Sequence, residues 1–111
     1  MTTPNEWWVK QNDTYGYITE QLLDENLVGV NLAGASVAFH MKRSTDAAYK
    51  VKAAATVLDS ANGIVRYAWT GTDLNTVGNF NFEWQVTFVS GKVLTFPNDG
   101  YNLIHVLKEL A

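Results

Sequence analysis

The side chains able to bind a metal ion or transfer a proton are few and scattered along this chain. There are two histidines, His40 and His105, and eleven acidic residues. A metal site normally needs several His, Asp or Glu side chains at suitable spacing, and no second ligand stands near either histidine. His40 falls in the polar register of its segment and is expected at the surface or an edge, whereas His105 is expected to be partly covered. The pattern favours ordinary sheet residues and predicts no metal site.

Most carboxylates lie in turn-like segments, where Asp side chains bond local backbone amides without a catalytic role. Glu83 is the exception, because it lies inside a strand pattern, and we predict that it pairs across the sheet with a cation such as Arg66. The sequence nominates no partner for a catalytic carboxylate pair. It also contains no glycine-rich phosphate loop, nucleophile elbow or zinc-protease motif. We therefore predict no catalytic residues, no cofactor and no enzymatic activity.

The tryptophans carry more information than the titratable groups. Trp7 and Trp8 are adjacent, and adjacent strand residues point to opposite faces, so at least one of them cannot face the core. A single exposed apolar residue is common and needs no explanation. Tryptophan is also enriched at interface hot spots, which favours a partner-binding arm formed by Trp7, Trp8 and Val9. Both interpretations are compatible with the sequence.

The element that organises the domain is the segment at residues 78–89. Its even positions from Phe80 to Phe88 carry large apolar side chains, and its odd positions from Asn79 to Thr87 carry polar ones. A period of two indicates a strand with one buried face. So much aromatic surface needs an opposing layer, which predicts a sandwich or a barrel. The predicted core positions are Phe39, Met41, Tyr67, Trp69, Phe80, Phe82, Trp84, Val86, Phe88 and Phe96.

Short segments of the same kind run along the rest of the chain. Residues 60–63 predict a hairpin in which Asn62 and Gly63 take positive φ. Residues 72–77 predict a connection with one helical turn capped by Thr72 or Asp73. The candidate strands are residues 6–10 (a strand or an arm), 17–23, 30–35 (short and broken by Gly34), 36–43, 49–59, 64–70, 78–89, 92–96 and 101–107. Turns about every 8–12 residues predict an all-β, immunoglobulin-like antiparallel β-sandwich of about seven to eight strands.

Length and composition set further limits. The 111 residues fit a single domain, residues 1–111, with an N-terminal arm at 1–12 and a C-terminal tail at 108–111. No cysteine is present, which excludes disulfides and thiolate metal sites. A formal net charge of -3 argues against nucleic-acid binding. The N-terminus does not resemble a secretory signal, and no apolar run approaches the ~20 residues of a membrane helix.

Several motifs resemble a known family in their order. An L-D-x-N-x-x-x-V-x-L-x-G-A pattern at residues 23–35 precedes V-x-F-x-M at residues 37–41. G-x-V-x-Y-x-W follows from Gly63 to Trp69, then T-D-L…G-x-F-x-x-E-W-x-V-T-F from Thr72 to Phe88, then G-K-x-x-T-F-P at residues 91–97. Over about residues 15–107, the chain resembles the immunoglobulin-like N-terminal domain of the upper baseplate proteins of tailed phages.

The resemblance implies a non-enzymatic structural module that attaches a longer region to the tail, with no catalytic residues or cofactor. It implies that other phage virion proteins are the partners, in a symmetric multi-copy assembly, and a homo-oligomer is compatible with this arrangement. The mild negative charge and the lack of a long apolar run predict that neither nucleic acid nor a membrane is bound. The protein is then made in the host cytoplasm and located in the virion, in a baseplate, tail, connector or capsid surface. We expect this chain to lack the stalk of that family, which favours a small adaptor or decoration role.

Two expectations follow for experiments. Removing residues 1–10 is expected to leave a folded monomer that no longer enters particles. The alternative function is a carbohydrate-binding or host-surface adhesion module, and its distinguishing feature is a planar row of exposed aromatic rings on one sheet face.

Overall fold

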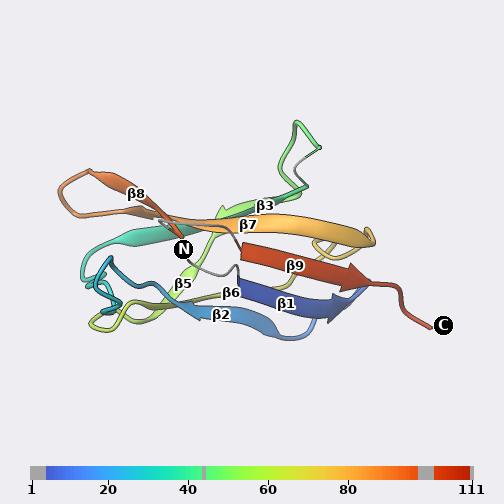
Figure 1. Ribbon diagram of the computed structural model, residues 1–111, viewed down its shortest axis with the longest axis horizontal. Coiled ribbons are helices and arrows are strands. Elements are labelled where there is room, and N and C mark those ends of the chain that lie inside the picture. Colours follow the sequence, from blue (N-terminus) through green and yellow to red (C-terminus); the bar gives the residue numbers. More distant parts are fainter. Residues whose placement is uncertain (1–4, 44, 98–101, 111) are drawn as a thin grey trace.

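The computed structural model describes residues 5–43, 45–97 and 102–110. These residues form nine strands in two sheets and no helix, which confirms the all-β sandwich (Figure 1). None of them belongs to a helix that could span a membrane. The strands are β1 (Asn5–Lys10), β2 (Tyr17–Gln21), β3 (Ser36–Lys42), β4 (Val51–Ala54), β5 (Thr56–Asp59), β6 (Ile64–Ala68), β7 (Gly78–Thr87), β8 (Val93–Phe96) and β9 (Asn102–Leu107).

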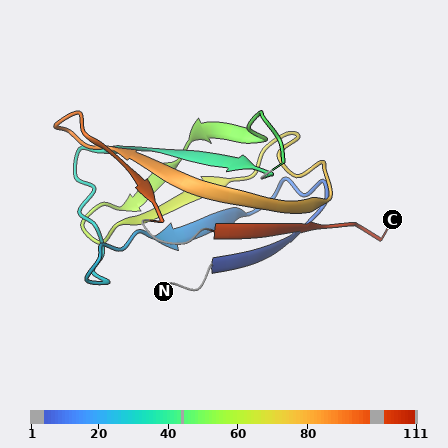
Figure 2. The same cartoon turned by 45° about the horizontal axis from the view of Figure 1, so that its top comes forward.

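The larger sheet has six strands in the order β1-β9-β7-β3-β4, and β8 also pairs with β7. Two strands pair along the same edge of the long strand β7: residues 78–82 pair with β9, and residues 84–87 pair with β8. β1 pairs with β9 in parallel and forms one edge of this sheet (Figure 2). The smaller sheet has the order β2-β6-β5. The first and last strands of the chain are therefore neighbours.

The core lies between the two sheets and is centred on Phe39, which is fully buried. The Phe39 ring stacks on Tyr67 of the opposite sheet, with ring centroids 4.7 Å apart, and contacts Trp84 of its own sheet at 4.9 Å. Nine of the ten predicted core positions are among the buried residues, and Phe88 is partly buried against them. Phe88 lies just beyond the end of β7, and its N–H donates to the Lys92 carbonyl at 2.8 Å. Ring contacts across the layers position the two sheets.

Two predicted strands differ from the structure. Residues 49–59 form two strands, because β4 pairs with β3 in the larger sheet while β5 pairs with β6 in the smaller one. The chain changes sheets at Ala55, whose N–H still donates to the Val37 carbonyl at 2.8 Å. Residues 30–35 form no strand, although Leu32 is buried and donates its N–H to Ser60 at 2.7 Å. Splitting one segment and adding residues 5–10 gives nine strands instead of seven or eight.

The predicted turns are partly confirmed. The β5–β6 hairpin forms, and Gly63 has φ of +72°, whereas Asn62 does not adopt positive φ. A Cβ at position 63 would lie 2.7 Å from the Val30 carbonyl oxygen, so only glycine fits. Residues 72–77 form no helix, although the Asn75 N–H donates to the Thr72 carbonyl at 3.2 Å in a single hydrogen-bonded turn. Asp73 instead accepts hydrogen bonds from the Tyr67 hydroxyl at 2.6 Å and the Thr70 N–H at 2.9 Å.

Candidate partner-binding edge

The edge strand β1 divides its side chains between the core and solvent. Trp7 packs its ring against Phe82 with centroids 5.0 Å apart, and Val9 also contacts the core. Trp8 points the other way and is 61% exposed. Residues 5–10 therefore form a strand of the sheet rather than a free arm, because two of their side chains fill core positions. Of the three predicted partner-binding residues, Trp8 alone presents most of its side chain to solvent.

Trp8 is held in place by a row of side chains across the outer face of the larger sheet. Its indole stacks on the His105 imidazole of β9, with centroids 5.0 Å apart and an interplanar angle of 20°. His105 Nε2 lies 2.9 Å from the Glu6 carboxylate, and Nδ1 lies 2.7 Å from the Asn79 side-chain oxygen. His105 is partly covered, as predicted. The row Asn79–His105–Trp8 ends at the sheet edge, and among the described strands none covers the second face of the indole.

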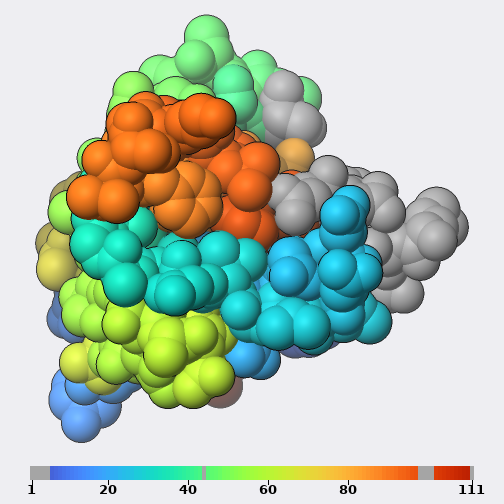
Figure 3. All heavy atoms as spheres, turned by 90° about the vertical axis from the view of Figure 1, so that its left-hand side faces the viewer, coloured from blue at the N-terminus to red at the C-terminus, as the bar shows by residue number. Residues whose placement is uncertain are grey.

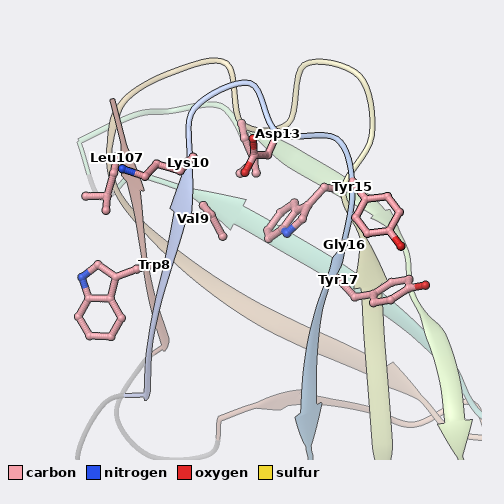
Figure 4. A pocket seen from close by; sticks show the side chains of 10 residues that line it. Trp8, Val9, Lys10, Asp13, Tyr15, Gly16, Tyr17 and Leu107 are labelled. Atoms are coloured by element: carbon pink, nitrogen blue, oxygen red, sulfur yellow. The ribbon is translucent and has the colours of Figure 1, made fainter. Parts of the chain in front are cut away.

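A hollow of about 390 Å³ lies beside β1 at the end of the sandwich. Buried Trp69 and Leu74 lie at its base, and Lys10 and Asp13 supply its charged groups. Figure 4 shows Trp8 and Leu107 on one side of the hollow, and Tyr15 and Tyr17 on the other. The exposed aromatic rings that line this hollow therefore do not form one planar row. The lining residues are Trp8, Val9, Lys10, Asp13, Tyr15, Gly16, Tyr17, Trp69, Leu74 and Leu107.

A second group of exposed apolar side chains, missed in the sequence, lies at the opposite end. Val89, in the turn between β7 and β8, is 84% exposed, and Val93 and Leu94 of β8 are also exposed. Figure 3 shows this hairpin beside the segment at residues 24–36. Leu27 in that segment is 78% exposed. The alternating pattern could not reveal this group, because it depends on two turns that lie far apart in the sequence.

Two predictions about polar residues were wrong. His40 is buried, with 6% exposure, because β4 pairs along β3 and the Tyr49 ring lies 5.1 Å from its imidazole. Glu83 does not pair with Arg66, since the two belong to different sheets. Its carboxylate lies 3.5 Å from His40 Nδ1. Arg66 instead lies over the Tyr17 ring, 4.2 Å from the centroid.

The sequence analysis did not single out an inward-facing carboxylate on β2. Glu20 accepts hydrogen bonds from the Trp84 indole N–H at 2.7 Å and from the Asn102 side-chain amide at 2.9 Å. Both donors are fully buried and belong to the larger sheet, so Glu20 joins the two layers. The alternation of Ile18, Glu20 and Leu22 was the available signal, because it places the carboxylate on the apolar face.

Among the described residues, two groups have shifted pKa values, and both lie away from the β1 edge. Burial, together with the hydrogen bond to Asp73, raises the pKa of Tyr67 to about 12. Hydrogen bonds from Asn62 lower the pKa of Asp59 below its usual value. Within residues 5–43, 45–97 and 102–110, no group of three or more His, Asp or Glu side chains could hold a metal ion.

Comparison with solved structures shows the class to which this fold belongs. The N-terminal domain of phage TP901-1 ORF48 is similar, with a TM-score of 0.66 and 18% identity over 97% of this chain and 91% of that chain. CopC from Methylosinus trichosporium OB3b is similar with a TM-score of 0.55 and 14% identity, over 96% and 88% of the two chains. No protein-family model and no curated protein matches the chain. The two structural similarities show a shared β-sandwich fold across the described domain.

Proposed function

We propose that this protein is a non-enzymatic assembly module of a tailed-phage virion, binding neighbouring virion proteins in a multi-copy structure. The observation that carries the proposal is the fold similarity to a phage N-terminal domain, which extends over 97% of this chain and 91% of that chain. The ordered motifs from residue 23 to residue 97 support the same conclusion, since they resemble the N-terminal domain of upper baseplate proteins. Fold and motifs thus agree over the same residues.

The β1 edge is the surface that suits such a role. An edge strand offers unpaired backbone groups to a neighbouring chain, and an exposed tryptophan is a favourable interface anchor. Trp8 is fixed by His105 before any partner binds, so little side-chain freedom is lost on binding. Many copies in a symmetric particle make a small contact sufficient, because each bound copy raises the effective concentration of the next.

Mass spectrometry of purified particles tests the proposal. Particles prepared from the phage or prophage that encodes the chain should contain its peptides at a ratio to the major tail protein that stays constant across a density gradient. Peptides confined to the soluble lysate would overturn the virion assignment. A particle protein of known structural role and an abundant host protein serve as the positive and negative references.

Glycan binding is a second candidate, and the hollow beside β1 is the observation that favours it. Tyr15 is 96% exposed at its rim, and Lys10 and Asp13 supply hydrogen-bonding groups. Against it, the rings of Trp8 and Tyr17 lie on opposite sides of the hollow (Figure 4). A glycan array with the isolated protein decides this point: specific binding abolished by Tyr15→Ala supports the candidate, and an empty array removes it.

A further inference from the structure

Within the part of the chain that the structure describes, no strand pairs with the outer edge of β1, which carries a defined set of backbone donors and acceptors. The N–H of Gln11, immediately after β1, donates to a β9 carbonyl at 2.7 Å. Successive residues of a strand direct their N–H and C=O groups to opposite sides, so Lys10, Trp8 and Glu6 direct theirs away from β9. The Lys10 carbonyl accepts a 3.3 Å bond from the Asp13 N–H, in agreement with this orientation. Figures 1 and 2 show β1 as the outermost strand of its sheet.

The side chains on this edge are self-complementary. Glu6 and Lys10 flank Trp8 at equal spacing on the outer face, and Trp7 and Val9 flank it on the inner face. In an antiparallel pair of two β1 strands centred on Trp8, Glu6 lies opposite Lys10 of the second copy at both ends. On the inner face, Trp7 lies opposite Val9. From Glu6 to Lys10, each cross-strand pair then joins opposite charges or two apolar side chains.

We propose that two copies of this chain associate through β1, antiparallel and centred on Trp8, so that the two larger sheets join across a twofold axis. Glu6, Trp8 and Lys10 direct their backbone groups outward, and this pairing places them opposite one another. Trp8 therefore exchanges both N–H···O bonds with Trp8 of the second copy. The free face of each indole, opposite to His105, meets the other indole. The contact is isologous and closes on itself, which gives a dimer rather than a fibre.

This dimer is expected to be weak in solution. A pair of six-residue strands forms a small contact, below the roughly 1,200 Å² of total buried surface that marks stable complexes. We expect a dissociation constant on the order of 10–100 µM. The inference deepens the proposed function by naming one partner of the β1 edge, yet it concerns the isolated protein. Two results would separate the proposals. A dimer of the isolated protein that is absent from particles would support the dimer alone, and particles that contain the protein only as a monomer would support the proposed function alone.

Charge reversal tests the register directly. Sedimentation velocity of the unmodified protein from about 5 µM to about 1 mM should show a monomer–dimer equilibrium. Lys10→Glu places Glu6 opposite glutamate, and Glu6→Lys places Lys10 opposite lysine, so each variant alone should dimerise about 10- to 30-fold more weakly. An equimolar mixture of the two variants restores both attractive pairs and should form a heterodimer. Lys108→Glu makes the same charge change in the exposed C-terminal tail and should leave dimerisation unchanged.

Three results would overturn the proposal. The first is an unmodified protein that stays monomeric at about 1 mM, far above the expected dissociation constant. The second is a Lys10→Glu variant that dimerises as well as the Lys108→Glu control. The third is a mixture of two folded variants that shows no more association than either alone. Glu6→Lys also removes the contact with His105, so circular dichroism checks that this variant is folded. If it is not folded, the comparison of Lys10→Glu with Lys108→Glu tests the dimer.

Discussion

Separate alanine substitutions at Trp7 and Trp8 give the sharpest test of how β1 divides its roles. Trp7 is largely covered and packs edge-on against Phe82. Truncating a core tryptophan costs about 3–5 kcal/mol, and roughly half of that applies to a partly buried site. The ring pair adds about 0.5–1 kcal/mol. Trp7→Ala is therefore expected to lower the free energy of unfolding by about 2–3 kcal/mol.

Trp8→Ala should behave differently. The side chain is 61% exposed and loses mainly its stack on His105, so the cost should stay near 1 kcal/mol. At about 4 °C per kcal/mol for a domain of this size, Trp7→Ala lowers Tm by about 8–12 °C and Trp8→Ala by about 4 °C. Self-association and particle incorporation should show the reverse order, with Trp8→Ala losing both while it remains folded.

Urea unfolding followed by circular dichroism measures the two free energies, and sedimentation velocity at matched concentrations measures association. Trp7→Phe serves as a control, because it keeps an aromatic ring against Phe82 and should recover part of the loss. Equal destabilisation by the two alanine variants, or full self-association of Trp8→Ala, would refute the division of β1 into a core face and a partner face. Deleting residues 1–10 removes both tryptophans and cannot make this distinction.

Three further predictions concern the fold that supports the edge. Glu20→Ala removes the acceptor of two buried donors and should cost about 3–5 kcal/mol in urea unfolding, whereas Glu20→Gln keeps an acceptor oxygen and should cost less than half as much; equal losses would contradict the interlayer role. Because the pKa of Tyr67 is raised from 10.0 to about 12, the unfolded chain loses this proton first, so stability should fall as pH rises from 10 towards 12. Tyr67→Phe should remove this part of the pH dependence of stability, and an unchanged pH dependence would contradict its assignment to Tyr67. Gly63→Ala should cost about 2–4 kcal/mol through a 2.7 Å clash and positive φ, and Gly71→Ala, which also has positive φ but open space, should cost about 1 kcal/mol; comparable losses would exclude the clash.

The sequence was sufficient to predict the fold class and most strands. Alternation from Asn79 to Phe88 reports directly on a strand with one buried face, and its aromatic residues require an opposing layer. The change of sheets at Ala55 could not be read in the same way. Both halves of residues 49–59 alternate in phase, and only the identity of their neighbours separates them. Pairing between distant segments is set by tertiary contacts that a local period does not encode.

The same limit applies to the polar residues and to the edge. Adjacent tryptophans predict that one side chain points inward, but the pairing of β1 with β9 decides which one. That pairing joins the two ends of the chain in parallel, and no local motif signals it. His40 lies in a polar register, yet β4 pairs beside it and the Tyr49 ring packs against its imidazole. A register predicts which face a side chain occupies, whereas burial depends on what later packs over that face.

Exposed edge strands favour uncontrolled pairing, and the charges on β1 limit this to one arrangement. A parallel pair in register would place Glu6 opposite Glu6 and Lys10 opposite Lys10, and both contacts repel. A slip by two residues would set Trp8 against a charged side chain and shorten the ladder. A slip by one residue would turn the inner face of one strand towards solvent. The antiparallel pair centred on Trp8 avoids all three penalties, so the residues that protect the edge from other strands are the same ones that select a second copy of it.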